Sequence, residues 1–330
     1  MKTRLSMLAG AGALFALSPL ALALNVPGPV VDNQWLAAHL NEVTVLDVRP
    51  SQKSFTGAPE FETDKKSGKK LIVGIGGHID GAVPVDNKKV RVTRKIEGLE
   101  LKGMIPERAD FEKLARSWGA TSNRPIVIVS AGIDPMDFND AARLFWQFKV
   151  YGEDNIAVLN GGTAGWITAG KQISHAPVAP ATGNWTSRSD RSAQFMATSQ
   201  DVAKAQASQS EQLIDARSDA FYLGLDRSGA ATTSGHIDGA KNLYTAMMST
   251  DRHGQPATLY GSATYSDMFV MSGVNPRAAS ITYCNTGHQA SGVWFVMTQI
   301  MGNHKVKLYD GSLHEWTHEK RPTVAARLTQ

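Results

Sequence analysis

The hexapeptide GHIDGA occupies residues 77–82 and recurs, unchanged, at residues 235–240 of this 330-residue chain. Three further pairs of similar segments follow the same order in the two halves. One short match can arise by chance, but four matches in one order indicate a tandem duplication. The further pairs are VTVLDVRP (43–50) with EQLIDARS (211–218), residues 111–130 with 265–284, and VLNGGTAGW (158–166) with LYDGSLHEW (308–316).

Each half alternates short apolar runs with helical patterns. Residues 43–46, 126–129 and 156–159 are apolar runs with the length and composition of buried parallel strands. Between such runs, apolar residues recur at helical spacing. The alternation predicts an α/β fold of two tandem domains, each with a mostly parallel central sheet flanked by helices.

Three helical patterns support this prediction. Asp110 can cap a helix whose apolar stripe starts at Phe111, and Gly119 can end it. A second apolar stripe starts at Phe138. A third, within residues 293–301, has the spacing i, i+3, i+4, i+7, i+8 and predicts a helix that faces the core.

The first 23 residues have the layout of a secretory signal peptide. Lys2 and Arg4 give a positive start, an apolar stretch follows, and small residues up to Ala23 offer a cleavage site. A membrane anchor is the alternative, but Ser18 and Pro19 interrupt the short apolar stretch. We therefore expect cleavage near Ala23, a periplasmic location and no membrane insertion after cleavage.

A segment rich in Pro, Ser, Thr and Gly, residues 174–190, has the composition of a linker. The predicted organisation is a signal peptide (1–23), a first domain (24–173), the linker (174–190) and a second domain (191–330). Domains of about 150 residues bury enough apolar surface to fold without disulfides.

The net charge and the cysteine content limit the possible functions of the chain. The formal net charge is +4, and removal of Lys2 and Arg4 would leave +2, which gives no support for nucleic acid as a partner. Cys284 is the only cysteine, so the chain cannot form an internal disulfide. An odd cysteine in an exported protein is a free reactive thiol or an intermolecular link, and an inert core thiol is the third interpretation.

The position of Cys284 favours the reactive thiol. It lies between a predicted strand, residues 281–283, and a helix expected to start near Ala290. In α/β proteins such a loop lies at the carboxyl edge of the sheet, where ligands bind. The loop N–H groups and the positive end of the helix would favour a thiolate, and Gly287 permits the turn they require.

The order of these motifs resembles the two-domain rhodanese, or thiosulfate sulfurtransferase, family over about residues 40–320. The shared order is Asp-x-Arg at a strand end, GHIDGA, a strand that ends in a loop, and a final Asp-Gly before a Trp. The resemblance implies that Cys284 is the catalytic nucleophile of the second domain. Ser130 takes its place in the first domain, which would be non-catalytic. The implied loop that binds substrate and persulfide comprises Asn285, Thr286, Gly287, His288, Gln289 and Ala290.

The resemblance also implies a reaction. The Cys284 thiolate takes the sulfane sulfur of thiosulfate or a related small anionic donor, and the Cys284 persulfide then passes it to cyanide or a thiol. A periplasmic thiol protein is a candidate acceptor, and no metal or organic cofactor is required. The alternative is a periplasmic carrier or binding protein that loads a persulfide or other chalcogen without turnover.

This chain departs from the family's thiosulfate enzymes, which carry basic residues where it has Asn285, Thr286 and Phe221. An anionic donor needs positive charge nearby, and Arg227 is one candidate to supply it. His288 is another, as a cation or proton donor, with a solvent-facing turn residue as the alternative.

Residues that both halves share are better explained by structure than by chemistry. Arg217 is a further candidate for substrate binding, but Asp47 and Arg49 repeat the pair Asp215 and Arg217 in the half without the thiol. The same reasoning assigns structural roles to His78, His236, Trp166 and Trp316, which occur in matching pairs.

Two other interpretations of the thiol are weaker. A cysteine phosphatase needs Cys-x5-Arg so that the arginine can clamp phosphate, but the sixth residue after Cys284 is Ala290. Cys284 and His288 have a spacing that could bind a metal, but two ligands without further partners are a weak signal.

Overall fold

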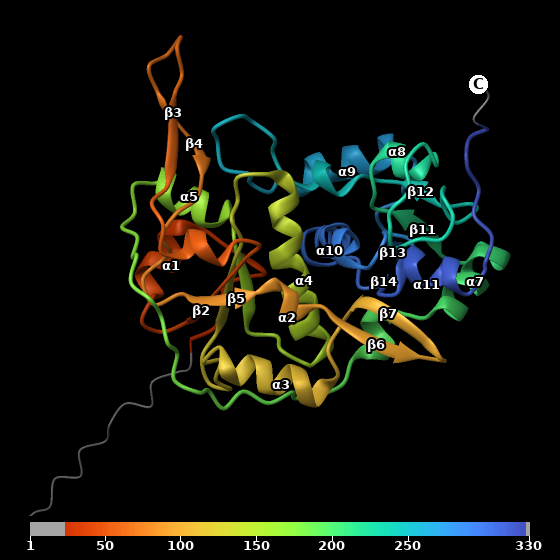
Figure 1. Cartoon of the computed structure of the whole chain (residues 1–330), viewed down its shortest axis with the longest axis horizontal. Coiled ribbons are helices and arrows are strands. Elements are labelled where there is room, and N and C mark those ends of the chain that lie inside the picture. Colours follow the sequence, from red (N-terminus) through yellow and green to blue (C-terminus); the bar gives the residue numbers. More distant parts are fainter. Residues whose placement is uncertain (1–23, 328–330) are drawn as a thin grey trace, which may run out of the picture.

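The computed structural model describes residues 24–327 (Figure 1). The predicted signal peptide and its cleavage site at Ala23 lie outside the described residues. Each half of the chain contains a five-stranded parallel sheet, and the two sheets have the same topology. The tandem α/β architecture predicted from the sequence is therefore confirmed. No helix in residues 24–327 is both long enough and apolar enough to span a membrane.

The first half places its sheet between helices and adds two antiparallel hairpins (Figure 1). In spatial order the strands are β1 (Val30–Val31), β9 (Ile156–Leu159), β8 (Ile126–Val129), β2 (Thr44–Arg49) and β5 (Val83–Asp86). The helices are α1 (Asn33–His39), α2 (Asn87–Val90), α3 (Arg108–Ser117), α4 (Phe138–Val150) and α5 (Gly162–Thr168). The hairpins pair β3 (Glu60–Thr63) with β4 (Lys70–Gly74), and β6 (Val92–Ile96) with β7 (Leu99–Met104).

The second half repeats this strand order, and its edge strand β12 is shorter than the equivalent β5. Its strands are β10 (Met196–Ala197), β14 (Val306–Tyr309), β13 (Ser280–Tyr283), β11 (Gln212–Asp215) and β12 (Lys241–Asn242). Its helices are α6 (Ser192–Phe195), α7 (Ser199–Ser208), α8 (Asp219–Tyr222), α9 (Ser262–Met271), α10 (His288–Phe295) and α11 (Ser312–His318). A π-helical turn, Val296–Ile300, continues α10.

Two helix starts differ from the sequence-based predictions. Helix α3 begins with Glu107 at its N-cap, so Asp110 lies in the first turn, where its charge suits the positive helix end. Gly119 follows the end of this helix with φ +76°, as expected of a terminating glycine. Helix α10 begins at His288 rather than near Ala290, because the left-handed Gly287 redirects the chain two residues earlier.

Helices α4 and α10 pack against each other at the centre of the molecule and join the two halves (Figure 1). The Phe295 ring of α10 meets the rings of Phe138 and Phe145 edge-on, at centroid distances of 5.3 and 4.8 Å. Gly292 allows this approach, because a Cβ there would lie 2.3 Å from Asn139 Oδ1. The buried apolar residues of both halves consequently form one continuous cluster.

The predicted linker, residues 174–190, forms no helix or strand beyond an isolated bridge from Ser174 to His78. It is not free of the first half, because Trp185 is fully buried and packs edge-on against Phe111. The Trp185 indole N–H also donates to the Glu153 carboxylate at 2.8 Å. The segment is therefore a strap fixed along the first half.

Candidate active site

Cys284 directly follows β13, at the carboxyl edge of the second sheet, and Ser130 directly follows β8 in the first. Equivalent helices, α11 in the second half and α5 in the first, anchor these loops in the same way. In the second half the Leu313 N–H donates to the Cys284 carbonyl at 3.1 Å. In the first half the Thr163 N–H donates to the Ser130 carbonyl at 2.9 Å. The predicted equivalence of Cys284 and Ser130 therefore holds in three dimensions.

Ser312 closes the cysteine loop, and the sequence analysis missed it. Its hydroxyl accepts the N–H groups of Cys284 and Gly287 at 3.1 and 3.0 Å and donates to the Tyr309 carbonyl at 2.8 Å. Ser312 is fully buried and has a φ of +51°, a conformation that disfavours side chains. Its counterpart in the duplicated segment is Gly162, at φ +56°. The sequence could have pointed to Ser312, because a serine stands there while the equivalent position of the first half is Gly162.

Four N–H groups around the loop are free. Within residues 24–327, no acceptor receives a hydrogen bond from the amides of Asn285, Thr286, His288 or Gln289. Gly287, at φ +73°, turns the chain between the first two and the last two. The amides of His288 and Gln289 are in the first turn of α10, where the helix has no internal acceptor for them. Together they form a site that can hold negative charge.

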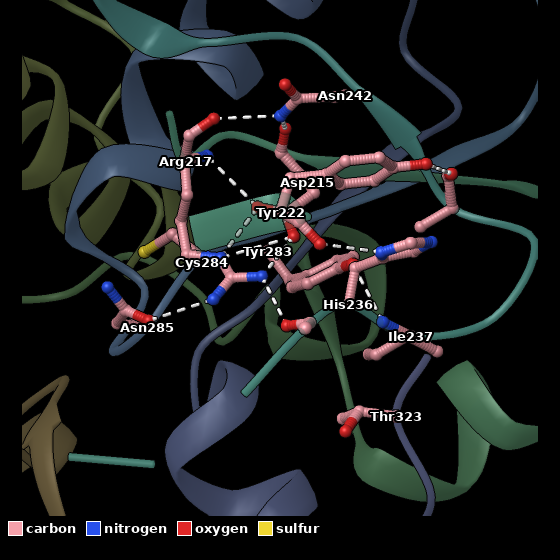
Figure 2. A network of polar contacts seen from close by, with 12 residues as sticks. Asp215, Arg217, Tyr222, His236, Ile237, Asn242, Tyr283, Cys284, Asn285 and Thr323 are labelled. Atoms are coloured by element: carbon pink, nitrogen blue, oxygen red, sulfur yellow. Dashed lines mark hydrogen bonds and ion pairs between the residues drawn. The ribbon is translucent and has the colours of Figure 1, made fainter. Parts of the chain in front are cut away.

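The Cys284 thiol is covered. Its side chain belongs to the shared apolar cluster, and the residue exposes 1% of its surface. Figure 2 shows the sulfur pointing away from the polar network around Asp215 and Arg217. The thiol thus has the predicted position at the sheet edge, but side chains shield it from solvent.

The β6–β7 hairpin of the first half packs against the cysteine loop. Gly103 on β7 lies so close that an added Cβ would be 3.1 Å from the Thr286 Cβ. Three residues nearer to the turn of the hairpin, the Glu100 carbonyl lies 3.3 Å from His314 Nε2. His314 is itself tied to the loop through its N–H, which donates to the Asn285 carbonyl at 2.9 Å.

Arg217 forms an ion pair with Asp215 and also contacts the loop (Figure 2). Its Nε and Nη2 atoms lie 2.9 and 2.6 Å from the two carboxylate oxygens of Asp215. Its Nη1 donates to Asn285 Oδ1 at 3.3 Å. Arg49 pairs with Asp47 in the half that has no thiol. Both ion pairs therefore have a structural role, and Arg217 also contacts the cysteine loop. The role of Arg217 in substrate binding stays a prediction.

The repeated histidines also have structural contacts. The His236 ring stacks on Tyr222 with centroids 3.7 Å apart, and its Nδ1 donates to the Tyr222 carbonyl at 2.7 Å (Figure 2). His78 repeats this arrangement on Phe55. Trp166 and Trp316 are buried in the cores of their halves, so the structural interpretation holds for all four residues.

His288 is held by the first half of the chain. Its Nε2 lies 2.9 Å from Asp140 Oδ1 on α4, and its side chain is 24% exposed. Burial lowers the pKa of His288 from its usual value, against the opposing effect of the Asp140 carboxylate. His288 is therefore not a solvent-facing turn residue.

Within residues 24–327, Arg227 forms no hydrogen bond or ion pair with the cysteine loop. The residue is exposed, and its Nη1 donates to the Ala231 carbonyl. Phe221 lies beneath Arg217, whose guanidinium carbon is 5.9 Å from the centre of the ring. The role of Arg227 in substrate binding stays a prediction without a supporting contact in this structure.

Two further arginines reach the loop from the first half, and the sequence analysis identified neither. Arg91 Nη2 donates to Thr286 Oγ1 at 2.6 Å. Arg143 on α4 pairs with Asp310 at 2.6 Å and donates to the Gly287 carbonyl at 3.4 Å. No local pattern marks these residues, because they lie far from the loop in the sequence.

Comparison with known proteins gives the family. The model of the rhodanese-like domain matches residues 32–169 and again residues 198–319. A thiosulfate sulfurtransferase of Corynebacterium glutamicum is 26% identical over 308 residues, which are 90% of this chain and 90% of that protein. A 3-mercaptopyruvate sulfurtransferase of Escherichia coli is 27% identical over 298 residues, 87% of this chain and 94% of that protein.

Solved structures support the fold. The crystal structure of a 3-mercaptopyruvate sulfotransferase from Escherichia coli superposes with a TM-score of 0.66 at 24% identity, over 86% of this chain and 98% of that chain. An anaerobic ergothioneine biosynthesis enzyme from Chlorobium limicola superposes with a TM-score of 0.69 at 18% identity. That superposition covers 91% of this chain and 71% of the Chlorobium chain.

Proposed function

The chain belongs to the rhodanese-like family, and from that premise we propose that it is a sulfurtransferase that carries sulfane sulfur as a persulfide on Cys284. Its relatives include thiosulfate and 3-mercaptopyruvate sulfurtransferases, which supports sulfur transfer as the reaction. The observation that carries the assignment to Cys284 is its place beside the free amides of Asn285, Thr286, His288 and Gln289.

The proposed reaction has two displacements. The Cys284 thiolate attacks the outer sulfur of thiosulfate, the S–S bond of the donor breaks, and sulfite leaves with the electron pair. A nucleophile, cyanide or a thiolate, then attacks the terminal sulfur of the persulfide and regenerates the Cys284 thiolate. The loop N–H groups stabilise the negative charge on the terminal sulfur, as an oxyanion hole does for oxygen.

The burial of Cys284 adds a requirement to this scheme. Because the residue exposes 1% of its surface, a donor can reach the sulfur only when the covering side chains shift. Gly103 and Thr286 lie at the contact between the β6–β7 hairpin and the loop. We infer that this contact opens during the loading step.

We also propose that the protein acts in the periplasm after cleavage near Ala23, with a periplasmic thiol protein as a candidate acceptor. The layout of residues 1–23 supports export. The intact mass of the protein recovered from a periplasmic extract tests this proposal. A chain that starts at Met1 and stays in the cytosolic fraction would contradict it.

Mass spectrometry tests the persulfide. Mixing the protein with thiosulfate, mercaptopyruvate or polysulfide should add ~32 Da, the mass of one sulfur. The Cys284→Ser variant should fold normally and gain nothing. If no donor modifies Cys284, the proposed function is wrong.

A steady-state assay with thiosulfate and cyanide separates an enzyme from a carrier. A sulfurtransferase should release thiocyanate continuously, whereas a non-turnover carrier should load once and stop. Such a single turnover would favour the carrier.

A further inference from the structure

Among the residues that the structure describes, three arginines donate hydrogen bonds to the cysteine loop, but two of them are already paired with carboxylates. Arg217, which touches Asn285, is paired with Asp215, and Arg143, which touches Gly287, is paired with Asp310. Both ion pairs are buried, so their charges are largely compensated within the protein. The loop itself contributes no arginine or lysine.

Arg91 is the exception. In the part of the chain that the structure describes, its guanidinium forms no ion pair, and it contacts the loop through the Thr286 hydroxyl at 2.6 Å. Its Nε is buried without an acceptor. Burial, followed by the like charge of Arg143, lowers the pKa of Arg91, against the opposing charges of Cys284 and of two nearby aspartates. A bound anion would supply the compensation that this cation lacks.

Resting on the proposed sulfur transfer, we propose that Arg91 of the first half binds the oxyanion group of the sulfur donor. That group is the sulfonate end of thiosulfate or the carboxylate of a mercaptocarboxylate. The assignment explains how a loop with neutral Asn285 and Thr286 can serve an anionic donor: the cation comes from the half that lacks the nucleophile.

The two ends of thiosulfate then have separate partners. The outer sulfur forms its new bond to Cys284 Sγ and remains near the loop amides, while the S–S bond of the donor breaks. The electron pair leaves on the sulfite, whose oxygens Arg91 holds. A guanidinium suits this role because its N–H groups form strong, oriented hydrogen bonds to oxyanions.

The backbone around Arg91 keeps it close to the loop. Arg91 follows α2 and leads into β6, and Gly103 on the partner strand has a φ of +81°. A Cβ at Gly103 would lie 2.9 Å from Arg91 Nη2 and 3.1 Å from the Thr286 Cβ. Glycine therefore permits the hairpin to bring the guanidinium against the hydroxyl.

Alkylation of Cys284 tests the charge of the site without requiring sulfur transfer. Iodoacetate and iodoacetamide are similar in size and differ in charge, so the ratio of their rates reports the potential at the thiol. Arg91→Gln should lower the iodoacetate-to-iodoacetamide ratio roughly 10-fold, since it removes a charge-assisted hydrogen bond. Arg91→Lys should retain part of the wild-type preference for iodoacetate, because it keeps the positive charge. Arg94→Gln is the matched control, because Arg94 lies three residues further along the chain, on β6, and pairs with Glu107 at 3.2 Å.

Kinetics with thiosulfate give the second readout. Arg91→Gln should raise the KM for thiosulfate roughly 10- to 100-fold, and Arg94→Gln should leave it unchanged. An unchanged alkylation ratio would overturn the assignment of Arg91. Equal slowing with both reagents would also overturn it, because Arg91 would then only hold the loop in place. A wild-type protein that no donor loads would instead refute sulfur transfer, while the alkylation ratio would still decide whether Arg91 attracts anions.

Discussion

Replacement of Ser312 by alanine should release the cysteine loop. The hydroxyl of Ser312 is the acceptor for the buried N–H groups of Cys284 and Gly287. Each buried donor left without a partner costs about 1–3 kcal/mol. A water molecule that enters the space would recover part of this loss. We therefore expect Ser312→Ala to lower the free energy of unfolding by roughly 2–4 kcal/mol.

Ser312→Gly separates the hydrogen bonds from the backbone conformation. Ser312 has a φ of +51°, which costs a residue with a side chain about 1–2 kcal/mol relative to glycine. The glycine variant loses the same hydroxyl but relieves this strain, and the first half already has Gly162 at the equivalent position. It should therefore be about 1 kcal/mol more stable than Ser312→Ala, after allowance for the greater freedom of glycine in the unfolded chain.

Urea unfolding gives the stabilities, and single-turnover loading from thiosulfate gives the function. Both variants should load Cys284 more slowly than the wild type, because the N–H groups of the loop are no longer fixed. If Ser312→Ala is as stable as the wild type, the hydroxyl is not the anchor that the hydrogen bonds indicate. If Ser312→Ala is the more stable of the two variants, the reasoning about φ is wrong.

Two further predictions concern buried charges. Arg217→Met should lower the free energy of unfolding by roughly 3–5 kcal/mol, because it leaves the fully buried Asp215 carboxylate without its partner. It should also slow the loading of sulfur onto Cys284, because Asn285 loses its hydrogen bond from Arg217. Arg49→Met is the control in the first half. It should lose a similar amount of stability in urea unfolding but load sulfur onto Cys284 at the wild-type rate. Slow loading in both variants would contradict a specific role of Arg217 in holding the cysteine loop. Burial raises the pKa of Glu315 to about 7. The protonated carboxyl therefore contributes fully to folding stability below the unfolded-state pKa of 4.5, and this contribution is lost as the pH rises through about 7. Glu315→Gln should therefore raise the midpoint of thermal unfolding more at pH 8 than at pH 5, and an equal effect at both values would show that the carboxyl is not perturbed.

Local patterns were sufficient to predict the fold. The runs at residues 126–129 and 156–159 are strands β8 and β9, and the repeated segments correspond to equivalent elements of two sheets with one topology. Such patterns are reliable because a strand buried on both faces must be apolar along its whole length. The position of Cys284 at the carboxyl edge of β13 followed from the same alternation of strand and helix.

Local patterns were less informative about the ends of elements. Helix α10 starts at His288 because Gly287 adopts a left-handed conformation, and the sequence placed the start near Ala290 instead. Glycine permits that conformation without requiring it, so the choice depends on the contacts of the folded loop. The residues His288, Gln289 and Ala290 therefore belong to the first turn of the helix rather than to the loop.

By itself, the sequence determined the duplication, the order of strands and helices, and which half holds the thiol, since each of these depends on residues close together in the chain. The tertiary structure alone decided what surrounds that thiol. Arg91 and Thr286 are 195 residues apart in the sequence, and they meet because α4 and α10 pack the two halves into one core. The burial of Cys284 has the same origin, because its side chain belongs to the apolar cluster that both halves share. Side chains that meet across such an interface share no spacing in the chain, and only the packed structure specifies them.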